Sequence, residues 1–331
     1  MMKITSDKPY PAPPVTENEH GNLRRVGFEL EFSGIQLEDA SAAVADALSG
    51  RVISKTAAET VIEADDLGEF IVELDWDYLK RKAADEDPQF SESGWLEYVS
   101  QAAALLVPVE VVCPPVPLDR LEMLDPMVRA LRRAGAVGTE ESLLAAYGVH
   151  INTEIPRLDS VTLHRYLRAY ALLQWWLVEK HEVDPTRKLS PYIDLYPEAY
   201  LHQVLARDAP EMAQLFDDYL EHNATRNRAL DLLPILKEID SKRIERDIDD
   251  PKVKARPAFH YRLPNCQIER VDWSLASSWS TWLVVERLAG REQDLQKLGD
   301  EFKQAQRPLL GVAREAWVER IDTWLSEHEL A

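Results

Sequence analysis

Apolar and charged residues alternate along a short stretch near the start of the chain, residues 27–32. Strand side chains point in turn to the two faces of a sheet, so the apolar side chains share one face and Glu29 and Glu31 share the other. A strand with one face in water would show the same alternation. Two carboxylates about 6.6 Å apart along a strand can also reach two neighbouring divalent cations. The stretch therefore predicts a strand whose acidic face is either solvated or ligating.

Later stretches repeat the alternation, and each predicted strand again has a polar face. An acidic face is also typical of an exposed sheet edge protected by charge, and a single histidine in a strand is commonly structural. Taken together, the stretches predict one curved, mainly antiparallel sheet with a carboxylate-lined concave face and helices packed on its other face. The polar-face residues are Glu73, Asp75 and Asp77 in 70–78, Glu110 in 107–113, His150 and Asn152 in 147–152, His260 and Arg262 in 257–263, and Gln267 and Glu269 in a returning hairpin strand.

Helical periodicity fills most of the remaining sequence, so the predicted fold class is α+β. Gly50 and Gly135 are expected to end two helices, and Asp159 or Ser160 to begin a third. Residues 51–64 are expected to form one further strand, and Asp272 to cap a helix that ends at Gly290. The expected helices cover residues 37–48, 119–133, 159–181, 197–248 with breaks near Pro210 and Pro234, and 272–290, and two more amphipathic helices are separated near Pro308.

The charge composition argues against some classes of binding partner. The 331 residues include 38 Lys and Arg against 58 Asp and Glu, which gives a formal net charge of -20. This charge argues against a nucleic acid or an anionic membrane as the main partner. Cys113 and Cys266 are the two cysteines, which form neither a disulfide framework nor a Cys-rich zinc site and so favour a cytoplasmic protein.

The polar faces offer many carboxylate oxygens, one imidazole on the strand 147–152 and no thiolate. Such ligands suit Mg²⁺ or Mn²⁺ better than zinc, and sites of this kind typically handle phosphates with Arg or Lys completing the charge clamp. Arg187 and Lys188 are either phosphate ligands or simple surface charge. The sequence contains no Walker-type phosphate loop, no Gly-x-Gly-x-x-Gly and no Gly-x-Ser-x-Gly, so a helix-cradled nucleotide or a serine hydrolase is not indicated.

An ordered set of motifs resembles the amidoligase family, within the carboxylate–amine ligase superfamily that includes glutamine synthetase and glutamate–cysteine ligase. Residues 27–32, Gly-Phe-Glu-Leu-Glu-Phe, look like the opening strand of that family, and Asp75 lies on the strand that usually carries an aspartate. The other motifs are Glu110-Val-Val-Cys-Pro-Pro, the helix 119–133 followed by Gly135-Ala136, Gly148-Val-His150-Ile-Asn152, Arg262-Leu-Pro-Asn265 and Ile268-Glu269-Arg270.

The resemblance implies a glutamine-synthetase-type fold and an ATP-dependent ligase that forms an amide or isopeptide bond through an acyl phosphate. Its expected partners are a small-molecule or peptide carboxylate and an amine, and an oligomer is compatible with it. The implied roles are metal binding (Mg²⁺ or Mn²⁺) for Glu29, Glu31, Glu110, His150 and Glu269, catalysis for Arg262, Asp75 and Arg270, and nucleotide binding for Asn265, Asn152 and Lys188.

The sequence pattern and the resemblance together give the expected domain organisation. Residues 1–22 are expected to form an irregular tail, and residues 23–331 a single amidoligase-like domain. That domain would include a mostly helical insert at 157–250, serving as a lid or flanking layer, and the C-terminal helices 272–328.

Two departures from the family pattern keep other functions open. Arg270 directly follows Glu269, whereas the family's Glu-x-Arg places both side chains on one face, so a bulge or Arg262 would have to compensate. Asp75-Trp76-Asp77 replaces the family's Asp-Gly-Ser. The alternatives are a metal-dependent phosphoester hydrolase that uses the same carboxylate face, and a degenerate member that binds a peptide or protein without catalysis.

Overall fold

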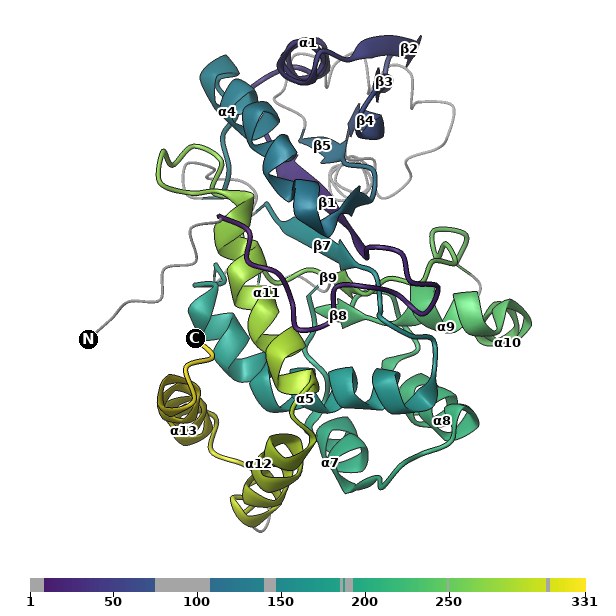
Figure 1. Ribbon diagram of the computed structural model, residues 1–331, viewed down its shortest axis with the longest axis vertical. Coiled ribbons are helices and arrows are strands. Elements are labelled where there is room, and N and C mark those ends of the chain that lie inside the picture. Colours follow the sequence, from purple (N-terminus) through teal and green to yellow (C-terminus); the bar gives the residue numbers. More distant parts are fainter. Residues whose placement is uncertain are drawn as a thin grey trace, which may run out of the picture.

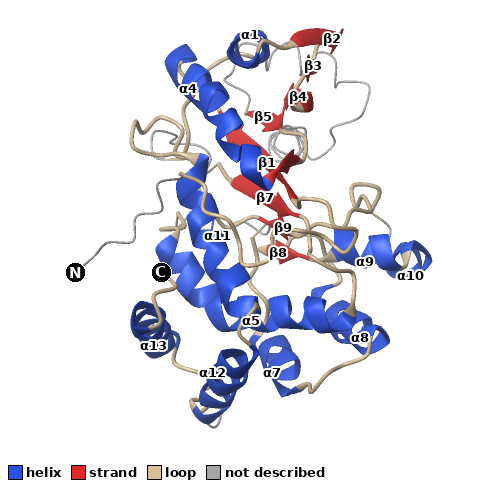
Figure 2. Cartoon of the chain, in the orientation of Figure 1, coloured by secondary structure: helices blue, strands red, loops and turns tan. Residues whose placement is uncertain are grey.

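The computed structural model describes residues 9–74, 108–139, 147–184, 187, 193–248, 250–307 and 310–331. Within these residues, nine strands form one open sheet in the order β2-β3-β4-β5-β1-β7-β9-β8, with β6 beside β1, and all of these strand pairs are antiparallel (Figures 1 and 2). The strands are β1 (Arg25–Phe32), β2 (Arg51–Lys55), β3 (Glu59–Ala64), β4 (Gly68–Leu74), β5 (Val109–Val112), β6 (Val116–Pro117), β7 (Val149–Thr153), β8 (Leu230–Asp231) and β9 (His260–Tyr261).

Strand β1 lies in the middle of the sheet, between β5 and β7. Its apolar side chains Phe28, Leu30 and Phe32 have no exposed surface, whereas Glu29 and Glu31 on the other face are half-buried. The alternation predicted from the sequence is confirmed here. It divides the sheet into an apolar face and a polar face.

Four helices cover the apolar face. Helices α1 (Leu37–Leu48) and α4 (Asp125–Ala134) pack at the β3–β4 end, and α5 (Ser160–Lys180) and α11 (Leu275–Ala289) pack at the β7–β9 end (Figure 1). Aromatic rings join α5 and α11 to β9 and the residue before it: Tyr166 stacks on Phe259 at 4.8 Å, and Trp282 lies 4.9 Å from Tyr261. The predicted α+β class is therefore confirmed.

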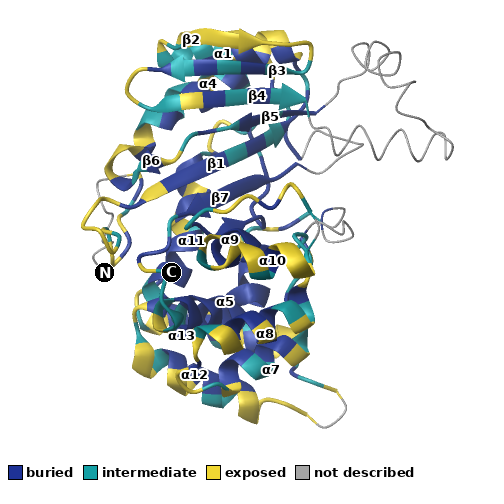
Figure 3. Ribbon diagram, turned by 90° about the vertical axis from the view of Figure 1, so that its right-hand side faces the viewer, coloured by how far each residue is buried: buried dark blue, intermediate teal, exposed yellow. Residues whose placement is uncertain are grey.

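The remaining helices form a layer around α5 and beside β8. Helices α7 (Glu198–Ala206), α12 (Glu292–Gln304) and α13 (Arg314–Glu327) contact α5, and α8 (Met212–Asn223) contacts α5 and α7 (Figure 3). Helices α9 (Leu233–Ile239) and α10 (Ser241–Asp247) follow β8. The segment 157–250 is thus mostly helical, but it also contributes β8 to the sheet.

Residues 9–22 form no helix and no strand, yet they are packed against the domain. Tyr10 is buried, and its hydroxyl donates to Asp125 Oδ1 at 2.6 Å. The indole of Trp279 donates to the Pro11 carbonyl at 2.9 Å.

Several predicted helix ends are correct. Asp159 begins α5 by accepting the Thr162 N–H at 2.7 Å, and Gly135 ends α4 with a φ of 101°. The helix predicted at 119–133 begins instead as the 3₁₀ helix Leu118–Leu124, and α4 starts with Pro126 in its first turn, where a proline is well tolerated.

Three local predictions are wrong for identifiable reasons. Residues 51–64 form the hairpin β2–β3, because the Thr56 hydroxyl accepts the N–H groups of Ala58 and Glu59 and turns the chain. The returning strand at 267–269 is a turn. The Arg132 guanidinium holds it by donating to the Ile268 and Trp273 carbonyls, at 2.6 and 2.8 Å.

The third wrong prediction concerns the start of α11. Asp272 does not cap this helix, which begins at Leu275 after Ser274; its carboxylate accepts hydrogen bonds from Arg270 instead. The short distance between Arg270 and Asp272 in sequence favours this local pair over a cap.

Candidate functional site

A row of glutamates crosses the polar face of the sheet from β3 to β1. Glu59 faces Glu73, Glu73 faces Glu110, and Glu110 faces Glu31 in the strand register. Directly opposite residues of an antiparallel pair lie on the same face with Cβ atoms about 5 Å apart, and like charges in such pairs repel. Divalent cations would relieve this repulsion.

His150 lies between the two glutamates of β1. Its Nδ1 is 2.7 Å from Glu29 Oε2, and its Nε2 is 3.5 Å from Glu31 Oε1. Among the described residues, two groups bring three ligand atoms within 4.8 Å of one another: Glu29, His150 and His260, and Glu31, Glu110 and His150. The structure therefore brings together Glu29, Glu31, Glu110 and His150, as the sequence predicted, while their role as ligands stays a prediction.

Glu29 is surrounded by nitrogen atoms. Besides His150, the Asn152 amide donates to Glu29 Oε1 at 2.8 Å, and His260 Nε2 lies 3.6 Å from Oε2. Burial alone would raise the pKa of Glu29, but the imidazoles of His260 and His150 hold it well below its usual value. Glu29 is thus a carboxylate at neutral pH and can serve as an anionic ligand.

His260 is a site residue that sequence reasoning missed. Its ring lies 5.0 Å from that of His150 in an edge-to-face arrangement. Burial, reinforced by the nearby Arg262, holds the pKa of His260 well below its usual value, and Glu29 opposes that shift. The signal was present in the sequence, because His260 shares the polar face of its stretch with Arg262.

Arg262 lies at the β9 side of the polar face. Its Nη2 is 3.2 Å from His260 Nδ1 and 3.8 Å from Asp231 Oδ2. Asp231 faces His260 in the register, and burial raises its pKa to about 6. The predicted catalytic Arg262 is thus close to the histidine–glutamate cluster and is backed by a buried carboxyl group.

Arg187 is a buried clamp rather than surface charge. It is 5% exposed and donates to the carbonyls of Arg262, Leu263 and Pro264 at 2.7 to 2.8 Å. Burial lowers the pKa of Arg187, and Glu31 opposes that shift. A Cβ on Gly148 would lie 2.6 Å from Arg187 Nη2, so glycine at this position lets the guanidinium approach β7.

The other predicted site residues lie around this cluster or outside the described residues. Asn265 forms hydrogen bonds with the chain that follows α5. Its amide donates to the Glu182 carbonyl at 2.9 Å, and its Oδ1 accepts from Arg187 at 3.2 Å. Glu269 is in neither ligand group and accepts the Gly138 N–H at 3.0 Å. Asp75 and Lys188 lie outside the described residues.

Arg270 points to a local partner. Its guanidinium donates to Asp272 at 3.0 and 3.2 Å, and its side chain is 39% exposed. The catalytic role predicted for Arg270 stays a prediction, and the described arginines that reach the cluster are Arg262, at 3.2 Å from His260 Nδ1, and Arg256, at 3.9 Å from Glu29 Oε1.

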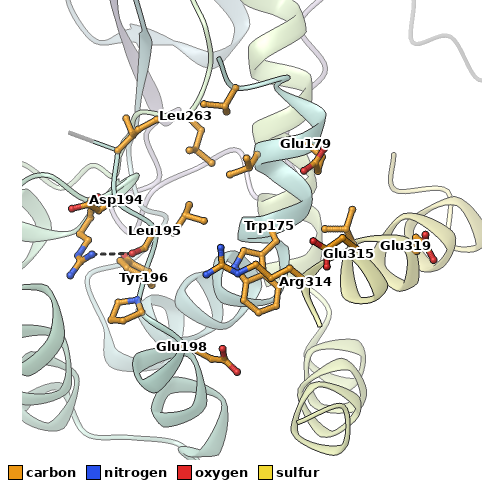
Figure 4. Close-up of a pocket in the computed structure, with 16 residues that line it drawn as sticks. Trp175, Glu179, Asp194, Leu195, Tyr196, Glu198, Leu263, Arg314, Glu315 and Glu319 are labelled. Carbon is orange, nitrogen blue, oxygen red and sulfur yellow. Dashed lines mark hydrogen bonds between the residues drawn. The ribbon is translucent and has the colours of Figure 1, made fainter. Parts of the chain in front are cut away.

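A separate cavity of about 800 Å³ lies on the helical side of the molecule (Figure 4). Trp175 and Glu179 of α5, the segment 193–198, and Glu315 and Glu319 of α13 line it. Leu263 also lines it, whereas the preceding Arg262 lies at the polar face. None of the described residues that line the cavity belongs to the two ligand groups.

Comparison with protein families decides the classification. The family model described as "Putative amidoligase enzyme" matches residues 22–284, well over half of the chain. The chain belongs to this family. The match extends from the start of β1 into α11, and so it includes the strands that carry the amidoligase motifs on the polar face, β1, β5, β7 and β9.

The comparisons with curated proteins and with solved structures found no significant match. Among the described residues, no helix is both long and apolar enough to cross a membrane.

Proposed function

We propose that this amidoligase family member is an ATP-dependent carboxylate–amine ligase. The observation that carries the proposal is the gathering of Glu29, Glu31, Glu110 and His150 on one sheet face, within a chain that matches the amidoligase family. A curved, concave face of the glutamine-synthetase type is part of the same proposal.

The donor set fits Mg²⁺ or Mn²⁺. Carboxylate oxygens are the ligands that these hard cations prefer, and the group of Glu31, Glu110 and His150 supplies two carboxylates with a single imidazole. Cys113 and Cys266 are both buried and outside the two ligand groups. When bound, the metal ions would supply charge neutralisation for the phosphoryl oxygens of ATP. The residues that would hold them are Glu29, Glu31, Glu110, His150 and His260.

The protein groups would act by binding and orientation. In the proposed reaction a substrate carboxylate oxygen attacks the γ-phosphorus of ATP, which forms an acyl phosphate and releases ADP. An amine then attacks the acyl carbon, phosphate leaves, and the amine nitrogen loses a proton to give the amide. Phosphoryl transfer of this kind depends on positioning and charge stabilisation, which Arg262 is placed to provide beside the cluster.

The test is calorimetric binding of ATP in the presence and absence of Mg²⁺. We expect metal-dependent binding in the wild type and a loss of at least about tenfold in affinity in Glu31→Gln, since the substitution removes one anionic ligand without changing the size of the side chain. Glu69→Gln is the matched control. Glu69 shares its face of β4 with Glu73 of the glutamate row, but it is exposed and outside both ligand groups.

The outcomes separate the three candidate functions. Metal-dependent ATP binding that survives unchanged in Glu31→Gln contradicts the proposed site. ADP release that requires both an acid and an amine supports the ligase, whereas release of phosphate from a simple phosphoester without an amine supports the hydrolase. A well-folded wild type that does not bind Mg·ATP supports the non-catalytic alternative.

A further inference from the structure

The cavity on the helical side of the molecule combines buried aromatic side chains with exposed carboxylates (Figure 4). Trp175 of α5 and Tyr196 are buried, whereas Glu179 of α5 and Glu315 and Glu319 of α13 are exposed. The aromatic rings therefore form the floor of the cavity, and the carboxylates form its rim. Its volume of about 800 Å³ lies within the range of sites that enclose small organic molecules.

The rim carboxylates have no counter-charge from the protein. Glu315 and Glu319 lie one turn apart on α13, a spacing at which like charges repel each other. Glu179 lies in the last turn of α5, where the helix dipole disfavours a negative charge. Among the described residues, none of the three side chains forms a hydrogen bond or an ion pair. A cation at the rim would relieve both kinds of unfavourable interaction.

Two arginines also line the cavity, but they are engaged elsewhere. Arg228 donates to the carbonyls of Leu195 and His222, at 2.9 and 2.7 Å. The guanidinium of Arg314 lies over the Trp175 ring, 5.3 Å from its centroid (Figure 4). This contact shows that the floor of the cavity attracts cations, because the face of an indole ring is negative. It leaves the rim carboxylates open to a cation from outside.

The indole of Trp175 also has an unused hydrogen-bond donor. Trp175 is 5% exposed and lines the cavity, and its Nε1 donates to none of the described residues. The indole of the next residue, Trp176, donates to Asp322 Oδ1 at 2.9 Å. Because a buried indole N–H usually has a hydrogen-bond partner, the Trp175 donor points to an acceptor on a ligand.

The carboxylates of the rim suit an organic cation better than a metal ion. A metal ion needs several ligand atoms close together, and neither described group within 4.8 Å includes Glu179, Glu315 or Glu319. Val178 of α5 and Val318 of α13 add apolar surface to the cavity. An aliphatic stem can be buried against such surface while its charged end stays in water at the rim.

We propose that this cavity binds a small lysine-like ligand, which carries a protonated amine, an aliphatic stem and a carbonyl oxygen. The ammonium group pairs with the rim carboxylates, the stem packs on the apolar lining, and the carbonyl accepts the Trp175 indole N–H. None of these residues belongs to the two ligand groups of the polar face. The inference is therefore independent of the proposed ligase function.

The experiment compares matched ligands by calorimetric titration into the full chain. The probe is N-acetyl-lysine N-methylamide, which has all three features. N-acetyl-norleucine N-methylamide lacks only the ammonium group, and hexylamine lacks the carbonyl. All titrations are made with EDTA and without nucleotide, so that the proposed metal site stays empty. We expect the lysine derivative to bind at least about tenfold more tightly than the norleucine derivative, and at least about threefold more tightly than hexylamine.

Variants test which residues hold the probe. The double variant Glu315→Gln, Glu319→Gln should bind the lysine derivative at least about tenfold more weakly than the wild type. Both positions are exposed, so the substitutions should leave the fold intact. Trp175→Phe keeps an aromatic ring but removes the indole N–H, and it should abolish the advantage over hexylamine. Glu327→Gln is the control, because Glu327 is an exposed residue at the end of α13 and does not line the cavity.

Several outcomes would overturn the proposal. Absence of binding by the lysine derivative, equal binding of the norleucine derivative, or full affinity in the folded double variant would reject the amine site. Equal binding of hexylamine to the wild type would reject the contact with Trp175. Loss of binding in Glu31→Gln would place the amine at the polar face instead. Binding of Gly-Gly-Lys-Gly-Gly at least about tenfold more tightly than the single-residue probe would indicate a protein partner rather than a small ligand.

Discussion

Glu29 and Glu31 lie two residues apart on β1 and face the same side, but their surroundings differ. Glu29 is 12% exposed and has nitrogen atoms of His150, Asn152 and His260 around it, whereas Glu31 is 24% exposed and accepts the Gly148 N–H at 2.8 Å. Glu31 is therefore the more open of the two carboxylates. This difference makes Glu31→Gln the cleaner probe of metal binding.

Asp231 gives the site a measurable pH dependence. Its pKa is raised by burial to about 6 from 3.8, so the folded protein holds a proton that the unfolded chain has already released in this range. The free energy of unfolding should therefore fall as the pH rises from about 4 to about 6, by about 3 kcal/mol in total for a shift of about two pH units.

The comparison with Asp231→Asn isolates this effect. Asparagine can still accept the Leu233 N–H that Asp231 Oδ1 accepts at 2.9 Å, but it does not titrate. Denaturant unfolding of both proteins at several pH values should show that the wild type loses stability relative to the variant as the pH rises. Parallel pH profiles for the two proteins would contradict the assignment.

At the scale of single residues, the sequence could predict the members of the cluster that share a strand pattern. Glu29, Glu31, Glu110 and His150 lie in stretches with clear alternation. Arg187 was predicted as a phosphate ligand or surface charge, and its buried role could not be predicted because its partners are carbonyl groups 75 to 77 residues away in sequence, which no local pattern reveals. Arg256 was missed because it precedes the short strand β9.

At the scale of elements, a buried ion pair joins β1, α5 and α11. Arg24, next to the start of β1, donates to both carboxylate oxygens of Glu286 on α11, at 2.8 and 3.0 Å, and both side chains are at most 1% exposed. Tyr166 of α5 and Trp282 also donate to this carboxylate. The network fixes the helices on the apolar face directly behind the strand that carries Glu29.

Removing the carboxylate should therefore be costly. Glu286→Ala leaves the buried Arg24 without its counter-charge, and we expect a loss of about 3 to 5 kcal/mol in the free energy of unfolding. Glu63→Ala is the control, because the side chains of Glu63 and its partner Arg51 are 39% and 76% exposed and their pair should contribute at most about 1 kcal/mol. Equal losses of stability in the two variants, measured by thermal or denaturant unfolding, would show that the buried ion pair stabilises the fold no more than an exposed one.

The elements themselves were predictable where periodicity is long, as in α5, and where a cap is local, as at Asp159 and Gly135. They were not predictable where a distant side chain decides the backbone. The turn at 267–269 follows from Arg132, whose donors reach carbonyls 136 and 141 residues away. The Thr56 turn that splits residues 51–64 depends on a single hydroxyl in a stretch that otherwise has strand composition.

At the scale of the whole molecule, a net charge of -20 and the glutamate row favour the binding of cations to the folded protein. A ligand that binds only the folded state raises stability, by about 2.7 kcal/mol when its concentration is 100 times its dissociation constant. We expect Mn²⁺ to raise the melting temperature of the wild type and EDTA to reverse the effect. Glu69→Gln should respond as the wild type does, and an equally large response in Glu31→Gln would contradict binding at the polar face.

The central place of β1 in the sheet has a consequence for synthesis of the chain. Glu29 pairs with Val112 and His150, so the two partners appear 83 (112 − 29) and 121 (150 − 29) residues later. At ribosomal speeds of about 5 to 20 residues per second, β1 waits roughly 4 to 17 s for its first neighbour. During that interval its backbone edges and its apolar side chains Phe28, Leu30 and Phe32 are open to other chains, which makes the nascent N-terminal segment a natural client for chaperones.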